Sequence, residues 1–127
     1  MSEKKFVTAI NCMDGRVQLP VLEWMKKEYK AEYVDIITEP GPNKILAEKN
    51  PRSCIDSIKK RVEISVLKHA SKIIAITGHY DCAGNPAEKE TQLHQIKNAV
   101  ETIRSWSFDV LVIGLWVDEH WTVHKIV

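Results

Sequence analysis

The sequence has only three cysteines, no excess of either charge and no long apolar run. Its 18 lysines and arginines nearly balance 17 aspartates and glutamates, which gives no indication of a nucleic-acid or anionic membrane partner. No stretch approaches the roughly 20 apolar residues of a membrane-spanning helix. An odd number of cysteines without an apolar signal segment argues against a disulfide framework and for a reducing compartment. We therefore expect a cytoplasmic protein.

Apolar stretches rich in β-branched residues alternate with amphipathic segments along the 127 residues, a length that suits one domain. The alternation predicts strands at residues 6–10, 33–37, 72–77 and 109–117, helices at about 20–29, 44–48, 50–69 and 86–106, and a closing hairpin strand at 121–127. Repeated strand–helix units join parallel strands through right-handed crossovers. We expect a single α/β domain over residues 1–127. Its sheet is mostly parallel, with about four strands, an antiparallel C-terminal edge strand and helices on both faces.

Residues 78–86 follow a buried strand and lie in a strand-to-helix turn. Asn85 and Pro86 have the residue types of a helix N-cap and first position, and Glu88 completes a capping-box pattern. The next helix is therefore expected to begin at Pro86. Open α/β sheets bind ligands at the carboxyl ends of their strands, so this turn is the expected place of a functional site.

A metal site is predicted where two strands end. His79 and Cys82 lie three positions apart in this turn, and Cys12 occupies the equivalent place after the first strand. If these two strands are neighbours, all three side chains meet. Two thiolates and one neutral imidazole match the charge and ligand preference of Zn²⁺, and three protein ligands leave a fourth position for water. The alternative is two buried thiols and a turn histidine that do not meet.

Asp14 and Arg16 follow Cys12 closely enough to form a charge-assisted pair beside that water. In this role Asp14 accepts the hydrogen bond of the water and Arg16 orients Asp14. The alternative is a loop ion pair that only caps the next helix.

The same residues resemble the motifs of the β-class carbonic anhydrases. Residues 12–16, Cys-Met-Asp-Gly-Arg, resemble the family motif Cys-x-Asp-Ser-Arg, and residues 78–82, Gly-His-Tyr-Asp-Cys, resemble its Gly-His-x-x-Cys motif. Residues 114–118 are similar to the strand that precedes the final hairpin of that family. The resemblance covers nearly the whole chain.

The resemblance implies a zinc lyase that interconverts carbon dioxide and bicarbonate through zinc-bound hydroxide. It implies Cys12, His79 and Cys82 as the zinc ligands, and Asp14 and Arg16 as the catalytic pair that keeps the fourth zinc position free. In that family the aspartate can itself occupy the fourth position, and close the site, when its pairing with arginine is lost. The resemblance also implies a homodimer or a higher homo-oligomer.

The sequence departs from the family pattern in four places. Ala83 and Gly84 replace the single glycine that usually follows the second cysteine. Gly15 stands where the family usually has serine, and residues 39–43, Glu-Pro-Gly-Pro-Asn, lack the usual Arg-Asn-Ala-Gly-Asn pattern. The chain starts close to its first strand, so we expect it to lack the N-terminal helices that wrap a partner in typical members. These departures indicate a short, divergent subgroup.

Two other functions fit the same metal site. One is hydrolysis of a related small molecule such as carbonyl sulfide or carbon disulfide. The other is a non-catalytic zinc-binding or regulatory module, in which Asp14 closes the fourth position and the metal only stabilises the loops.

Overall fold

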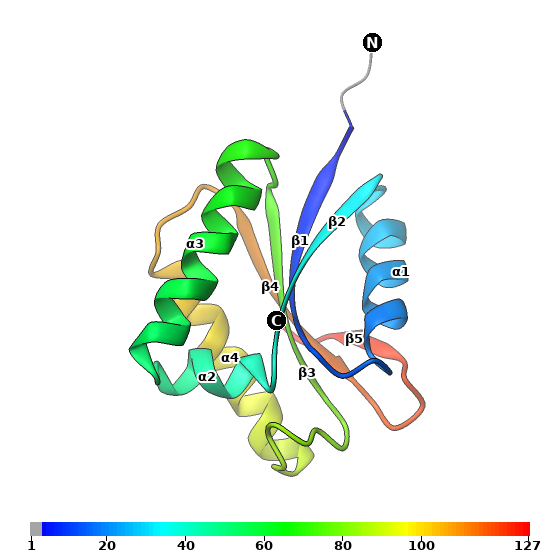
Figure 1. The fold of residues 1–127 in the computed structure, drawn as a ribbon. Coiled ribbons are helices and arrows are strands. Elements are labelled where there is room, and N and C mark those ends of the chain that lie inside the picture. The colour runs from blue at the N-terminus through cyan, green and yellow to red at the C-terminus, as the bar shows by residue number, and fades with distance from the viewer. Residues whose placement is uncertain (1–3) are drawn as a thin grey trace.

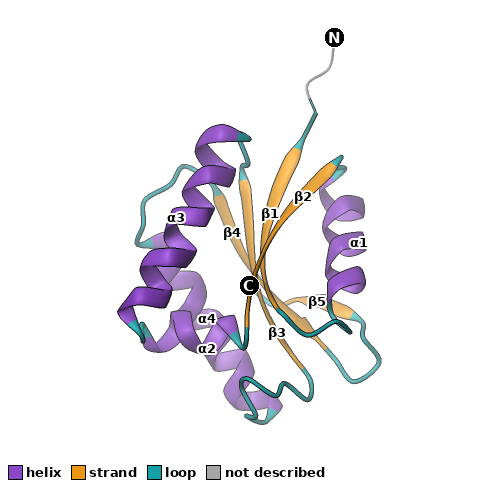
Figure 2. Cartoon of the chain, viewed as in Figure 1, coloured by secondary structure: helices purple, strands orange, loops and turns teal. Residues whose placement is uncertain are grey.

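The computed structural model describes residues 4–127, which form five strands and four helices (Figure 2). In chain order these are β1 (Phe6–Cys12), α1 (Gln18–Tyr29), β2 (Tyr33–Glu39), α2 (Pro42–Glu48), α3 (Arg52–Lys68), β3 (Ile73–His79), α4 (Lys89–Arg104), β4 (Leu111–Val117) and β5 (Val123–Lys125). None of the helices within this described range is long and apolar enough to cross a membrane.

The sheet has the strand order β2-β1-β3-β4-β5. The first four strands are parallel, and β5 is antiparallel to β4. Helix α1 covers one face, whereas α2, α3 and α4 cover the other (Figure 1). This arrangement confirms the expected α/β fold with a mostly parallel sheet and an antiparallel C-terminal edge.

Separate apolar clusters cover the two faces of the sheet. On the side of α1, Val7 and Ala9 of β1 pack with Val21 and Met25 of the helix. The fully buried residues of the other cluster come from β1, β3 and three helices: Ile10, Leu46, Ile58, Val62, Ile74, Ile76, Ala99 and Val100. Burial of one such large aliphatic side chain contributes about 1.5–3 kcal/mol. Because both faces are covered, the central strands read in sequence as continuous apolar runs instead of alternating ones.

Helix α4 begins at Lys89, so the prediction that it begins at Pro86 is wrong. The N-cap residue is Glu88, and no side chain caps this end. Asn85 is buried, and its amide donates to Gln95 Oε1 at 2.7 Å. A tertiary hydrogen bond therefore uses the side chain that the sequence pattern assigns to helix capping.

The topology places the ends of β1 and β3 side by side. These strands are direct neighbours, with Ala9 opposite Ala75 in register. Cys12 is the last residue of β1 and His79 is the last residue of β3. Parallel strands present their carboxyl ends at the same edge, so the predicted ligands lie at one edge of the sheet.

Candidate metal centre

Cys12, His79 and Cys82 converge at the carboxyl edge of the sheet. One ligand atom from each residue lies within 4.8 Å of the other two, and all three side chains are buried. The two sulfur atoms are 3.8 Å apart. The predicted metal ligands therefore do meet, in a group that can hold a metal ion.

The ring of His79 is oriented for metal binding. Its Nδ1 lies 2.8 Å from the carbonyl oxygen of Tyr80, which fixes Nδ1 as the protonated nitrogen and leaves a lone pair on Nε2. That Nε2 is buried and has no hydrogen-bond partner among residues 4–127. An unpaired buried polar atom costs about 1–3 kcal/mol. A metal ion beside the two sulfur atoms would use this lone pair.

The two thiols affect each other's ionisation. A hydrogen bond from the Cys82 thiol lowers the pKa of Cys12. The same contact raises the pKa of Cys82, because this thiol would lose its proton beside an existing thiolate. A divalent cation between the sulfur atoms would remove this conflict and stabilise both thiolates. Two sulfurs and one imidazole nitrogen form a donor set that suits zinc.

Asp14 and Arg16 lie beside this group. Arg16 Nη2 donates to Asp14 Oδ2 at 2.7 Å, and Arg16 Nε donates to Asp14 Oδ1 at 3.1 Å. Asp14 Oδ2 is 4.0 Å from His79 Nε2. The hydrogen bonds from Arg16 lower the pKa of Asp14 from 3.8 to about 2, against a smaller opposing effect of burial. The carboxylate next to the candidate metal centre is therefore ionised and held by the guanidinium.

A family model described as "Putative carbonic anhydrase" matches residues 2–127. The chain belongs to this family. Among solved structures, one from a study of two tetrameric β-carbonic anhydrases of Sordaria macrospora matches with a TM-score of 0.58 at 13% identity, over 98% of this chain and 82% of that chain. The β-carbonic anhydrase CafA of Aspergillus fumigatus matches with a TM-score of 0.50 at 15% identity, over 97% and 75% of the two chains. No curated protein matches the sequence. The chain thus has the β-carbonic anhydrase fold and is a divergent member of the family.

In this carbonic anhydrase family member, the loop after β2 packs directly on the loop that carries Cys82. A Cβ atom at Gly84 would lie 2.7 Å from Pro40 Cβ, so only glycine allows this approach. Gly41 has a φ of +60°, and a Cβ there would lie 2.8 Å from Asn85 Cβ. We call residues 80–85, which include Cys82, the metal loop. The divergent residues 39–43 therefore support the metal loop through close contact between the two backbones.

A buried amide network fixes both ends of the metal loop. Gln92 on α4 is fully buried, and its Nε2 donates to the carbonyl oxygens of His79 at 2.9 Å and Asn85 at 3.1 Å. Its Oε1 accepts a hydrogen bond from Asn43 Nδ2 at 3.1 Å. The sequence prediction missed Gln92, although its position one turn before the buried Ile96 marks it as part of the inward face of α4.

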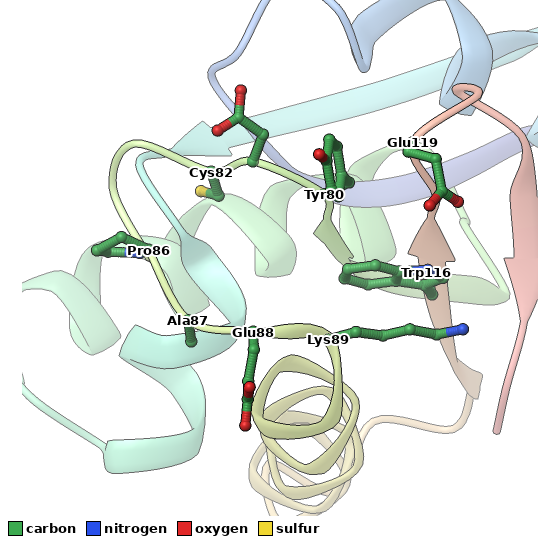
Figure 3. A pocket seen from close by; sticks show the side chains of 9 residues that line it. Tyr80, Cys82, Pro86, Ala87, Glu88, Lys89, Trp116 and Glu119 are labelled. Carbon is green, nitrogen blue, oxygen red and sulfur yellow. The ribbon is translucent and has the colours of Figure 1, made fainter.

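Two cavities adjoin the centre. A small one of about 190 Å³ is lined by Cys12, Met13, Asp14, Pro40, Ala83 and Gly84. A larger one of about 520 Å³ lies on another side of the metal loop and is lined by Tyr80, Asp81, Cys82, Pro86, Ala87, Glu88, Lys89, Trp116 and Glu119. In Figure 3, Cys82 and Pro86 lie at one side of this larger cavity, and Trp116 and Lys89 lie at the other. Of the two, only the small cavity includes Asp14.

Proposed function

We propose that this chain is a zinc-dependent carbonic anhydrase that catalyses the reversible hydration of carbon dioxide to bicarbonate. The observation that carries the proposal is the position of Asp14. Its carboxylate lies 4.0 Å from the free Nε2 of His79 and is held by Arg16. A metal bound by Cys12, His79 and Cys82 would thus have a carboxylate beside it that Arg16 keeps from becoming a ligand.

The donor set fits zinc, and each residue then has a distinct task. Cys12 and Cys82 would hold the metal as thiolates and His79 would hold it through Nε2, so that these three residues supply fewer ligands than zinc accepts. When bound, zinc lowers the pKa of a water molecule to near neutrality, which supplies a nucleophile. Asp14 is ionised and would accept a hydrogen bond from a water molecule held beside the metal. Arg16 occupies both carboxylate oxygens of Asp14 and fixes their direction.

The small cavity beside Asp14 supports a small, uncharged substrate. Its lining side chains are mostly apolar, and its volume of about 190 Å³ suits a molecule of few atoms. The pairing of Asp14 with Arg16 favours the catalytic reading over a non-catalytic module in which Asp14 closes the site.

We also propose that the protein acts as a homo-oligomer, at least a dimer, in the cytoplasm. The β-carbonic anhydrases of Sordaria macrospora are described as tetrameric, which supports the assembly. Cys12 and Cys82 must remain reduced to bind a metal, which supports a reducing compartment. Light scattering at micromolar concentration tests the assembly, and a monomer would refute it.

Elemental analysis of the purified protein, beside Cys82→Ser and Cys54→Ser variants, tests the metal site. We expect about one zinc per chain in the parent and in Cys54→Ser, and little in Cys82→Ser. Cys54 is the matched control because it is a free cysteine on α3 outside the candidate group. Absence of zinc after reconstitution under reducing conditions would refute the proposal.

Stopped-flow measurement of carbon dioxide hydration then tests the reaction, with carbonyl sulfide hydrolysis measured in parallel. Hydration by the parent and its loss in Cys82→Ser are expected. Zinc binding without hydration at any pH would favour a non-catalytic module, and hydrolysis of carbonyl sulfide alone would favour the related hydrolase.

A further inference from the structure

Arg16 is held by two residues besides Asp14. Its Nη1 donates to Asp81 Oδ2 at 3.2 Å, and its Nη2 donates to the Asp81 carbonyl oxygen at 3.0 Å. The guanidinium carbon also lies 4.7 Å from the centre of the Trp121 ring, within the range of a cation–π contact. Asp81 binds mainly through Nη1, whereas Asp14 binds through Nε and Nη2, so the two carboxylates occupy different edges of one guanidinium.

These two contacts come from different parts of the chain. Asp81 belongs to the metal loop and directly precedes Cys82. Trp121 belongs to the turn between β4 and β5, where Asp118 Oδ1 accepts hydrogen bonds from the backbone N–H groups of His120 and Thr122. Arg16 therefore connects the loop after β1 to the metal loop and to the C-terminal hairpin.

Asp81 and Trp121 both have left-handed backbone conformations, with φ of +57° and +60° respectively. Aspartate adopts this conformation with little strain, but for a bulky aromatic residue it is an outlier. Such outliers persist where the surrounding structure holds them, and they cluster at functional sites. At Trp121 the unusual backbone coincides with the contact between the indole ring and Arg16.

We propose that Asp81 and Trp121 are positioning residues that hold the Arg16 guanidinium on Asp14 and so keep Asp14 off the metal. The inference rests on the role proposed above for Asp14 and Arg16. The Arg16 side chain is 46% exposed, and an ion pair this exposed is weak when it stands alone. The hydrogen bonds to Asp81 and the contact with the Trp121 ring restrict the rotation of the long Arg16 side chain before it pairs with Asp14.

Three variants separate this positioning role from simple packing. Trp121→Leu removes the aromatic face and keeps an apolar side chain, whereas Trp121→Phe keeps the face. Asp81→Asn removes the carboxylate charge, leaves the backbone carbonyl in place and still tolerates a left-handed conformation. Urea unfolding of each variant identifies any loss of fold.

Visible spectra of the Co²⁺-substituted protein, titrated with thiocyanate, measure the affinity of an added ligand for the coordination position that Asp14 could otherwise occupy. We expect Trp121→Leu and Asp81→Asn to bind thiocyanate about 2–5-fold more weakly than the parent, because Asp14 competes for the fourth position. Trp121→Phe is expected to bind like the parent. Addition of Asp14→Ala to Trp121→Leu is expected to restore binding, because the competing carboxylate is gone. Unchanged thiocyanate affinity in both Trp121→Leu and Asp81→Asn would overturn the proposal.

A measurement on the metal-free protein decides the same question independently. The Nε–H of Arg16, followed by ¹⁵N NMR, is expected to exchange with solvent faster in Trp121→Leu and Asp81→Asn than in the parent and in Trp121→Phe. Equal exchange rates in all four proteins would overturn the positioning role, whether or not the parent binds metal. Failure to hydrate carbon dioxide would overturn the proposed function alone. Failure to bind zinc would also remove the effect on the metal, whereas the positioning of Arg16 by Asp81 and Trp121 would still stand or fall on the exchange rates.

Discussion

Gln92 donates its side-chain amide to the backbone carbonyl oxygen of His79, across 2.9 Å. This hydrogen bond connects α4 to the last residue of β3, from which the imidazole extends toward the two sulfur atoms. The same amide also holds the carbonyl oxygen of Asn85, at the far end of the metal loop. One fully buried side chain thus connects α4 to both ends of the metal loop.

Replacement of Gln92 by leucine is expected to lower the free energy of unfolding of the metal-free protein by about 2–4 kcal/mol, since the carbonyl groups of His79 and Asn85 lose a buried donor. Urea denaturation measures this change. Thr91→Ala, at the exposed neighbouring position, is the control and is expected to change stability by less than about 0.5 kcal/mol. A Gln92→Leu variant as stable as this control would show that water replaces the lost bonds.

Replacement of Arg16 by alanine is expected to spare zinc binding and to lower the rate of hydration by about 10–100-fold, because Asp14 loses the group that orients it. Zinc content and stopped-flow rates measure the two effects separately. Arg52→Ala is the matched control, since Arg52 forms an exposed ion pair with Asp56 on α3, far along the chain from the centre. Full activity of Arg16→Ala would refute the proposed pair.

Acid is expected to destabilise the fold in part through Asp14. Its pKa is about 2 in the folded protein and 3.8 as an isolated group, so the unfolded chain takes up the proton first as the pH falls. The stabilisation from Asp14 is therefore fully present above about pH 4 and is lost as the pH falls through 2. Urea unfolding between pH 5 and pH 2 measures it, and Asp14→Asn is expected to show a shallower loss than the parent.

Because Arg16 is partly exposed, solvent screening limits how much stability the ionised Asp14 contributes. Asp118 makes a second contribution to the loss of stability in acid. The hydrogen bond from His124 lowers the pKa of Asp118 to about 2 as well. The variant Asp14→Asn should therefore keep part of the acid dependence, and a further Asp118→Asn change should reduce it again. An unaltered slope in Asp14→Asn would contradict the folded-state pairing with Arg16.

Substitution of Gly114 by alanine is expected to destabilise the fold by about 1–3 kcal/mol, because α4 packs directly on the backbone of β4. An added Cβ would lie 2.5 Å from Ile96 Cγ2. Gly15→Ala is the control, since nothing lies within 4 Å of a Cβ at that position. Thermal unfolding of both variants measures the difference, and equal midpoints would show that α4 shifts to make room.

Prediction from the sequence succeeded where the signal is local. Residues 73–78 of β3 are all β-branched or small, and the strand is buried at every position, so its apolar run was sufficient to identify it. The start of α4 was predicted wrongly because Asn85 has the residue type of a cap, whereas its amide is used in the network with Gln95. Residue type alone does not show whether the Asn85 side chain caps the helix or forms a hydrogen bond with Gln95.

The sequence by itself determined the alternation of strands and helices, the chemistry of the donor set, and the location of Cys12 and His79 at strand ends. The tertiary structure decided that β1 lies beside β3, which brings the two sulfur atoms to 3.8 Å. It also decided that Gln92 holds the metal loop and that Arg16 contacts Asp81 and Trp121. Periodicity and spacing report the conformation of one segment at a time. Contacts between segments depend on how side chains from distant parts of the chain pack together, and these were established only by the folded arrangement.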